Sequence, residues 1–590
     1  MKSQSPLARL LTYHHRYALA FWLGMGGLLV ARIFEALIPV YLRDGIDRVE
    51  QTLDGTLSDP ALLTPALAIL ACVAARYAFI IVSRRVIRRI GVVIAYDLRK
   101  RVYAHLQRMG PAFFQRHPTG DLMARAVNDI QLVRQLIGMG LRTILVLLFS
   151  AATGLGFMFA LAPELAWVVL PPLPVIGWVG WRASRSVFAA STAVQAGFAN
   201  LSEQVQENLG GIRTVQAQVQ EQREIEAFDA VNTEYAQRYL HLVRLNSLIL
   251  ATMPWLGAWC VLSLIVVGGG LVRDGAVTVG TLAAFLWYLN MVLWPVRQAG
   301  QMVTLWQQGA SATERLFEIL DAEPEVEDGP CKALPEACGA LSIRTLRYQH
   351  PNAARPALRD LSLELKAGEL VAITGPVGSG KTTLLKSLVR LLDPPPGTVF
   401  LDGLDVREYA LSDLRARVVL VPQDPFLFAD VLGANLSYDD PRRAAQDILA
   451  AAGRADLTET IERLPEGLRT LVGERGVNLS GGQKQRSTLT RGIVQTAPLL
   501  LLDDVFSSVD TETESRILEG LRALRAGAST LLVTHRVSTA RTADRILVLD
   551  AGRVLGLGTH DALLEHCDAY AELERNQRLK DRIAHSEANA

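Results

Sequence analysis

The sequence of 590 residues has no excess of charge and few cysteines. Its net charge is +1 and only 20% of its residues are charged, so its overall charge gives no argument for nucleic-acid binding. The five cysteines are scattered and odd in number, which argues against a disulfide framework. Cys331 and Cys338 lack a matching pair, so a zinc site is not expected either. No small-residue cleavage site follows the first apolar run, so we expect no secretory signal.

Apolar residues, by contrast, are abundant, and their excess lies almost wholly before residue 310. Half of all residues are hydrophobic. Six apolar segments are each near the roughly 20 residues that a helix needs to cross a bilayer. We predict spans at residues 17–42, 62–82, 139–161, 165–181, 248–272 and 282–303. The sequence therefore predicts a membrane half joined to a soluble half.

The charges of the loops predict the orientation of these spans. Residues 84–108, after the second span, are rich in Arg and Lys, whereas residues 43–59, between the first two spans, are rich in Asp and Glu. Because basic loops stay in the cytoplasm, we expect both termini there. Residues 5–16 are basic and amphipathic, and they fit either a surface helix or a plain cytoplasmic lead-in.

Two cytoplasmic excursions, residues 83–138 and 182–247, read as long helices with few interruptions. The first is broken at Gly110-Pro111 and again at residues 117–121, and the second at Gly210-Gly211. Long helices must turn back at such breaks, and the turned tips are expected docking surfaces for another domain. Residues 324–339 are rich in Pro, Gly and acid, and they read as a linker between the halves.

A few polar side chains interrupt the predicted spans. Arg32 and Glu35 share one face of the first span, Arg76 lies in the second and Asn290 in the sixth. Charge inside a membrane is costly and usually faces a cavity or a partner, which makes these residues candidates for a functional site. The alternative is an Arg32–Glu35 ion pair that only fastens helices, and the sequence does not decide between the two.

The soluble half contains a phosphate-binding motif. The predicted strand 370–374 is followed by Gly375-Pro376-Val377-Gly378-Ser379-Gly380-Lys381-Thr382, and then by a predicted helix over residues 383–392. Glycines let backbone N–H groups curl around phosphates, Lys381 can reach the β and γ phosphates, and the Thr382 hydroxyl can ligate Mg²⁺. This order of strand, G-x-x-x-x-G-K-T and helix predicts an ATP site.

Two further predicted strands end at residues that could contact Mg²⁺ or a phosphate. Residues 499–502 are four leucines, typical of a strand buried on both faces, and Asp503 and Asp504 follow them. Ligands of open α/β sheets bind at the carboxyl ends of strands, so Asp503 is the expected Mg²⁺-side acid. A third strand, residues 529–534, ends at His535, whose imidazole could reach a γ-phosphate.

The segment Leu479-Ser480-Gly481-Gly482-Gln483-Lys484-Gln485-Arg486 matches the signature motif of ATP-binding-cassette (ABC) proteins. With six spans ahead of it, the chain resembles a half-size bacterial ABC exporter of the multidrug-resistance-like class. The implied fold is a six-span α-helical membrane domain fused to an α/β P-loop nucleotide-binding domain. The expected parts are an N-terminal elbow (1–16), a transmembrane domain (17–322), a linker (323–340), an ABC domain (341–575) and a tail (576–590).

The resemblance also implies roles for individual residues. Gln423 matches the Q-loop, residues 470–476 the X-loop, and Ser508-Val509-Asp510 the D-loop, while Gly120-Asp121 and residues 207–214 match the regions around the coupling helices. Asp504, His535 and Gln423 are the implied catalytic residues, and Thr382, Gln423 and Asp503 the Mg²⁺ site. The implied ATP-binding residues are His350, Tyr348, Gly375, Gly378, Ser379, Gly380, Lys381, Thr382, Thr383, Ser480, Gly481, Gly482, Gln483 and Asp510.

The chain departs from the family pattern at two places. The family's strand usually ends Asp-Glu, and here Asp504 stands at the Glu position, one methylene shorter by about 1.5 Å. The adenine-stacking residue is usually Tyr, but the family spacing falls on His350, with Tyr348 two residues earlier on the same face of a strand. Either ring could stack on adenine, and register favours His350.

The resemblance implies ATP-driven export of a hydrophobic or amphipathic substrate across the bacterial cytoplasmic membrane. It also implies a dimer in which ATP is bound between the P-loop of one subunit and the signature motif of the other. Because Asp504 shortens the catalytic side chain, we expect slow hydrolysis at this site and a non-identical partner that carries Glu. The alternatives are a homodimeric lipid or peptide exporter and an ATP-binding regulatory subunit. A soluble structural-maintenance ATPase would lack the spans, and an importer would usually place its spans and cassette on separate chains.

Overall fold

The computed structural model describes residues 17–56, 61–330, 334, 336–351, 353–473, 476–524 and 528–588. The proposed amphipathic segment 5–16 lies outside this range. The described chain divides into two compact units, one made of Met1–Gln107 and Pro118–Ala322 and the other of Arg108–His117 and Glu323–Ala590.

The described residues of the first unit form helices joined by turns, with no strand among them. Five of its helical stretches are long and apolar enough to cross a membrane, and Val279–Trp294 forms a shorter apolar helical stretch, which together fit the six predicted spans. The helices are α2 (Ala18–Leu53), α3 (Leu63–Leu106), α5 (Thr119–Ala124), α6 (Ile130–Gln135), α7 (Arg142–Leu161), α8 (Pro163–Val169), α9 (Pro172–Gly210), α10 (Ile212–Ala217), α11 (Glu221–Arg273) and α12 (Val279–Leu320), with two π-helical segments, η1 (Arg125–Asp129) and η2 (Leu136–Leu141).

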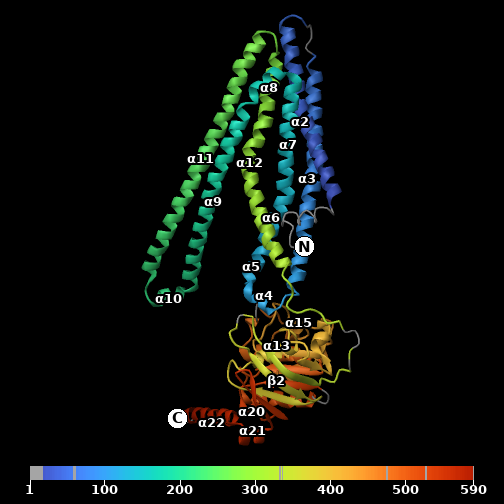
Figure 1. Ribbon diagram of the computed structural model, residues 1–590, viewed down its shortest axis with the longest axis vertical. Helices are drawn as coiled ribbons and strands as arrows, with labels where there is room; N and C mark the ends of the chain where they lie inside the picture. Colours follow the sequence, from blue (N-terminus) through green and yellow to red (C-terminus); the bar gives the residue numbers. More distant parts are fainter. Residues whose placement is uncertain are drawn as a thin grey trace. The chain divides into compact units, whose positions relative to one another are not determined.

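The predicted helix breaks lie where the sequence placed them. After α3 ends at Leu106, the short helix α4 (Pro111–Arg116) begins with its proline in the first turn, where a missing N–H costs nothing. Gly211 separates α9 from α10, and α10 closes the end of the long α9–α11 pair (Figure 1). The predicted fourth span is interrupted at residues 170–171, ahead of Pro172, so it consists of α8 and the start of α9.

Two apolar clusters hold the first unit together. One joins α2, α3, α6, η2 and α7 to the end of α12, and its most buried members include Met25, Ile94 and Ile130. The other packs α7, α8 and α11 against the start of α12 around Phe285 and Tyr288. The side chains that α11 buries lie between Met253 and Gly268, so its first half buries none among the described residues.

The second unit contains two sheets. The six-stranded sheet has the order β10-β9-β3-β8-β7-β6, with β6 to β9 and β3 parallel and β10 antiparallel at one edge. The four-stranded antiparallel sheet has the order β2-β1-β4-β5. The strands are β1 (Leu341–Tyr348), β2 (Leu358–Leu365), β3 (Leu370–Thr374), β4 (Val399–Leu401), β5 (Leu404–Asp405), β6 (Val418–Val421), β7 (Leu499–Asp503), β8 (Ser529–Val533), β9 (Arg545–Asp550) and β10 (Arg553–Gly558).

Helices cover these sheets and connect the parallel strands. Besides α4, they are α13 (Lys381–Leu388), α14 (Leu411–Arg417), α15 (Leu432–Leu436), α16 (Ala445–Arg454), α17 (Thr458–Arg463), α18 (Gly481–Ile493), α19 (Thr511–Leu524), α20 (Val537–Ala540), α21 (His560–His566) and α22 (Asp568–Ala588), with 3₁₀ turns η3 (Val406–Glu408) and η4 (Gly467–Arg469). The helix after the P-loop therefore begins at Lys381 and ends at Leu388, four residues before the predicted end. Helix α22 continues through the expected boundary at 575.

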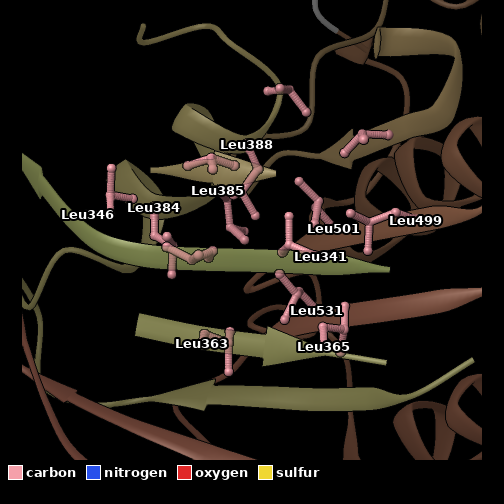
Figure 2. Close-up of a cluster of buried hydrophobic side chains, with 14 of the residues drawn as sticks. Leu341, Leu346, Leu363, Leu365, Leu384, Leu385, Leu388, Leu499, Leu501 and Leu531 are labelled. Atoms are coloured by element: carbon pink, nitrogen blue, oxygen red, sulfur yellow. The ribbon is translucent and has the colours of Figure 1, made fainter. Parts of the chain in front are cut away.

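A leucine-rich core joins the two sheets of this unit. Figure 2 shows leucines from β1, β2, β7, β8 and α13 converging in one layer. Strand β7 contributes Leu499 and Leu501 to this core, and Leu502 to a second cluster with α18 and α19 on its other face. The predicted burial of β7 on both faces is therefore confirmed, and it fixes where the strand's acidic end must lie.

Part of the predicted linker, residues 324–339, is anchored on the second unit. The buried Arg390 guanidinium donates to the carbonyl of Glu327 at 2.9 Å, and the Asp328 carboxylate accepts from the N–H of Leu411 at 2.9 Å. The local composition gave no hint of these bonds because their partners lie more than 60 residues away.

Candidate nucleotide site

Four strand ends bring the predicted site residues together. In the parallel sheet, Ile373 and Asp503 both pair with Val533, and Val421 pairs with Leu502. The carboxyl ends of β3, β6, β7 and β8 therefore lie at one edge, and the P-loop, Gln423, Asp504 and His535 follow these ends. This is the edge at which open parallel sheets bind ligands.

The P-loop depends on its glycines. Gly375 has φ of +149°, and a Cβ there would lie 1.9 Å from the carbonyl oxygen of Leu549. Gly380 has φ of +105°, and its Cβ would lie 2.6 Å from the carbonyl oxygen of Ala357. Side chains at these positions would collide with backbone atoms, so the loop can hold its curved path only with glycine.

Lys381 lies folded into this loop. Its ammonium group donates to the carbonyl oxygens of Gly375 at 2.9 Å and Pro376 at 2.8 Å, and to the Ser379 hydroxyl at 3.2 Å. Burial lowers the pKa of Lys381, while the charges of Asp504 and Asp503 oppose that shift. A partly desolvated cation held by neutral acceptors is well placed to receive phosphate oxygens.

Thr382 and Asp503 form an oxygen-rich pair. The Thr382 hydroxyl donates to the Asp503 carboxylate at 3.2 Å. Burial raises the pKa of Asp503, and the nearby charge of Asp504 adds to that shift. A hard cation would relieve this cost, and hydroxyl and carboxylate oxygens are ligands that Mg²⁺ prefers. Within the described ranges no group of three His, Cys, Asp or Glu residues could hold a metal.

Asp504 adopts an uncommon backbone conformation. Its φ is +49°, in the left-handed region, where Asp is among the better-tolerated residues. Its N–H donates to the carbonyl of Val533 at 3.1 Å, and its carboxylate accepts from the Gln423 amide at 3.4 Å. The last distance is too long for a strong hydrogen bond, so the Gln423–Asp504 contact is loose.

The two candidate adenine-stacking rings contact each other edge to face. The centroids of Tyr348 and His350 are 5.2 Å apart, and the His350 imidazole lies 3.4 Å from the Thr383 hydroxyl. Strand β1 ends at Tyr348, so the prediction that both residues share a strand is wrong for His350, which lies in the following loop. Burial raises the pKa of Tyr348.

Both rings line a cavity of about 840 Å³ together with Thr382, Thr383 and Lys386. A cavity of this size can hold a cofactor. The structure thus brings the P-loop helix and the two candidate stacking residues to one site.

The signature segment begins helix α18. Ser480 is the N-cap: its hydroxyl accepts from the N–H of Gln483 at 3.3 Å, and its own N–H donates to the Gln483 side chain at 2.9 Å. This reciprocal capping box fixes the N-terminus of the helix, where N–H groups favour an anion. Residues 480–483 do not line the cavity beside Tyr348 and Thr382.

Asp510, the predicted D-loop residue, also lies at the start of a helix. The Asp510 carboxylate accepts from the N–H of Thr513 at 2.9 Å at the start of α19, and this bond lowers the pKa of Asp510. His535 follows β8 with an exposed side chain, between the buried Thr534 and the half-buried Arg536. Two residues of the predicted X-loop, 474 and 475, lie outside the described residues.

Comparison with known proteins agrees with this geometry. Residues 21–296 match the ABC transporter transmembrane region, and residues 358–507 match the ABC transporter ATP-binding domain. The multidrug resistance-like ATP-binding protein MdlA of Escherichia coli is 33% identical over 82% of this chain and 82% of its own length. The chain belongs to the ABC transporter family.

Two further comparisons describe the kind of transporter. The multidrug efflux ATP-binding/permease protein Rv0194 of Mycobacterium tuberculosis is 36% identical over 96% of this chain, which corresponds to 47% of that protein. A solved bacterial Atm1-family ABC exporter with ATP bound has a TM-score of 0.80 and 26% identity, covering 94% of this chain and 98% of the other. The chain therefore has the half-size exporter fold, with one membrane-spanning region and one ATP-binding domain, and it is an ATPase-coupled, multi-pass membrane protein.

Sequence reasoning missed several residues that organise the exporter's site. The Gln485 side chain donates to the Ser507 hydroxyl at 2.8 Å and accepts from the N–H of Ser508 at 3.0 Å, which ties α18 to the segment after Asp504. Arg536, next to His535, pairs with the buried Glu514 and donates to the carbonyl of Val509 at 3.0 Å. Gln485 lies inside the signature motif, so its position could have been noticed, but its partners could not.

Glu325 is the third missed residue. Its carboxylate accepts from the N–H of Ala112 at 3.3 Å and lies 3.6 Å from the Arg116 guanidinium. Ala112 and Arg116 belong to α4, and Glu325 lines the same cavity as Tyr348 and His350. The first helical tip of the exporter is therefore attached beside the nucleotide cavity through an acid of the linker.

Proposed function

We propose that this chain is one subunit of a dimeric exporter that uses ATP hydrolysis to move a hydrophobic or amphipathic substrate out of the cytoplasm. The observation that carries the proposal is the division of the ATP machinery. The P-loop, Asp503, Asp504 and Gln423 lie at the carboxyl ends of parallel strands at one sheet edge, whereas Ser480 and Gln483 are bonded to each other at the start of α18. A complete site then requires the signature of a second chain.

Each residue of the site has a role in this scheme. Lys381 and the P-loop N–H groups bind phosphate oxygens, and Thr382, Asp503 and Gln423 hold Mg²⁺. Tyr348 or His350 stacks on adenine. When bound, Mg-ATP supplies the phosphoryl group that is transferred to water. Asp504 accepts the proton of the attacking water, His535 stabilises the phosphoryl oxygens, and Ser480 and Asp510 complete the partner's site.

The long α9–α11 pair supports the dimer. The first half of α11 and the whole of α10 bury no described side chain in this protomer. Large apolar side chains, including Phe198, Leu209 and Leu240, are exposed along the pair. Contiguous exposed apolar surface marks an interaction site. We propose that this pair packs against the second subunit.

We further propose that the transmembrane domain spans residues 17–322 and the nucleotide-binding domain residues 341–575. We also propose that the protein lies in the bacterial cytoplasmic membrane with both termini in the cytoplasm. The multidrug names of MdlA and Rv0194 support a hydrophobic or amphipathic substrate. The loose contact of Asp504 with Gln423 supports a slow site and a non-identical partner with Glu at this position. A homodimer in which Asp504 works slowly as the base is the second candidate.

Transport by the purified chain in proteoliposomes tests the proposal. ATP-dependent uptake of a fluorescent amphiphile into vesicles with outward-facing ATP domains is the expected result, and Lys381→Ala should abolish it. The Arg273→Gln variant serves as a control, because Arg273 is exposed at the end of α11, far in sequence from the P-loop. ATP hydrolysis without movement of any amphiphile would instead favour a regulatory subunit.

A further inference from the structure

Three charged side chains of the predicted spans meet in the membrane unit. The Glu35 carboxylate accepts from the Arg32 guanidinium at 2.5 Å, and its other oxygen lies 3.0 Å from the Arg76 guanidinium. Arg32 and Glu35 belong to α2, and Arg76 to α3, which packs along α2 (Figure 1). This group contains two cations and one anion. The Arg32–Glu35 ion pair considered from the sequence is therefore part of a triad with one surplus positive charge.

Further arginines increase this surplus. Arg84 acts electrostatically on Arg32, and Arg142 of α7 is repelled by Arg84, Arg88 and Arg32. The Nε atoms of Arg76 and Arg142 are buried, and neither has a hydrogen-bond partner among the described residues. Charge in a membrane is expensive, so the arginines that lie within the predicted spans, the arginine cluster (Arg32, Arg76 and Arg142), are expected to have a function.

One member of the arginine cluster, Arg32, lines a cavity of about 500 Å³. Arg32 and Glu35 line it together with Ser150 of α7 and Trp287, Asn290 and Trp294 of α12. The volume lies in the range of small-molecule sites, about 300–1,000 Å³. One side of the cavity therefore carries charge, and the other carries two large aromatic faces and apolar side chains.

These observations decide between three uses of the charged residues. A fastening ion pair needs only one arginine for Glu35, and it does not explain the other two arginines of the cluster. A site for cations would need a free carboxylate, but both oxygens of Glu35 are already held by arginines. An anion remains, because its oxygens can take up the unused guanidinium donors, and guanidinium groups match carboxylate and phosphate geometry.

We propose that this cavity is a substrate site that selects an amphipathic organic anion. A carboxylate, phosphate or sulfonate head contacts Arg32, and an aromatic or acyl body packs against Trp287 and Trp294. Arg76 adds positive charge behind the site through its ion pair with Glu35. Glu35 orients both guanidinium groups and limits the net positive charge before the anion arrives. The inference rests on the proposed export function, because it names the class of cargo that the exporter takes.

Equilibrium binding to the full-length protein in phosphatidylcholine nanodiscs tests the selection without ATP. The probes are three dodecyl chains that carry the same fluorophore (nitrobenzoxadiazole) at one end and a carboxylate, a hydroxyl or an amine at the other. The wild-type protein should bind the carboxylate most tightly. A charge-assisted hydrogen bond is worth about 1.5–3 kcal/mol, so Arg32→Gln should weaken carboxylate binding about tenfold or more and leave the alcohol unchanged. Arg76→Gln removes a positive charge beside Glu35 but none from the cavity lining, so it should weaken carboxylate binding less than Arg32→Gln does.

Glu35→Gln separates selection from mere fastening. It removes the competing anion, so carboxylate binding should become several-fold tighter and amine binding weaker, opposite to the arginine variants. Arg273→Gln, a surface arginine of the same unit, should change nothing. If Arg32→Gln and Glu35→Gln instead alter all three probes equally and both lower the melting temperature, or if the amine binds best, the proposed selection is wrong.

The transport assay keeps this inference distinct from the proposed function. If the alcohol and the carboxylate are bound and carried equally in every variant, export stands and anion selection fails. If the carboxylate is bound with the expected charge dependence but no probe moves with ATP, anion selection stands and export fails. A labelled phosphatidic acid held in the bilayer and dodecyl phosphate added from water, tested in separate arms, identify whether the anion enters from the lipid or from solution.

Discussion

Replacement of Asp504 by glutamate is the sharpest test of the catalytic site. The longer side chain adds one methylene, about 1.5 Å, and extends the carboxylate beyond its present position 3.4 Å from the Gln423 amide. Misplacement of a catalytic group by about 1 Å can cost roughly a hundredfold in rate. We therefore expect Asp504→Glu to raise the ATP turnover of the purified protein by about ten- to a hundredfold.

The backbone conformation of residue 504 makes the Asp504→Glu substitution destabilising. Asp504 has φ of +49°, and a left-handed conformation costs about 1–2 kcal/mol for residues less suited to it than Asp or Asn. The Asp504→Glu variant should thus be faster but slightly less stable, with a melting temperature a few degrees lower. Asp504→Asn, which keeps the shape and removes the base, should retain the melting temperature and lose turnover.

Mg-ATPase activity of the purified chain in nanodiscs, measured with all three variants at saturating ATP, distinguishes the possibilities. Robust turnover by the unmodified homodimer, with less than a twofold gain in Asp504→Glu and complete loss in Asp504→Asn, would refute the reasoning. In that case Asp504 is a competent base at its present length, and the argument for a non-identical partner fails.

Two further changes test the framework around the site. The Glu369 carboxylate binds the Arg545 guanidinium through both oxygens, at 2.5 and 2.9 Å. Burial would raise the pKa of Glu369, but its bonds to Arg545 and the N–H of Lys366 lower it overall. Arg545→Met should lower the free energy of unfolding by about 1 kcal/mol at neutral pH. This difference should shrink as the pH falls below 4.5, the ordinary pKa of a Glu side chain, because Glu369 then becomes protonated in the unmodified protein too. Thermal unfolding at several pH values measures this change. Gln485→Leu should lower ATP turnover severalfold with little change in ATP binding, since it releases Ser507 and Ser508; equal losses of binding and turnover would contradict this role.

The sequence predicted those parts of the site that depend on local chemistry. The P-loop, the leucine strand β7 and the capped start of α18 each follow from a short run of residues. Once these strands are parallel neighbours, their ends must share one edge. The same logic failed for His350, because a strand's end depends on ladder hydrogen bonds to β2, which a spacing argument does not see.

The parts that could not be predicted depend on contacts between distant segments. Glu325 reads as one acid in a polar linker, and only the fold brings it to Ala112, 213 residues earlier. Arg390, with φ of +47°, lies two residues after α13 ends, although the surrounding residues favour helix. Its buried guanidinium binds the carbonyl of Glu327 and the carboxylate of Asp393. Tertiary bonds override local propensity at such positions.

The bonds of Gln485 have a consequence for timing. In the proposed dimer, helix α18 begins at a partner's nucleotide, whereas Ser507 and Ser508 follow this chain's own Asp504. One amide side chain therefore joins the two ATP sites by way of hydrogen bonds of 2.8 and 3.0 Å. A slow event at Asp504 would hold α18, and with it the partner's site, in place until hydrolysis is complete. The short side chain of Asp504 would then determine how long the whole dimer stays closed, and its effect would not be confined to one site.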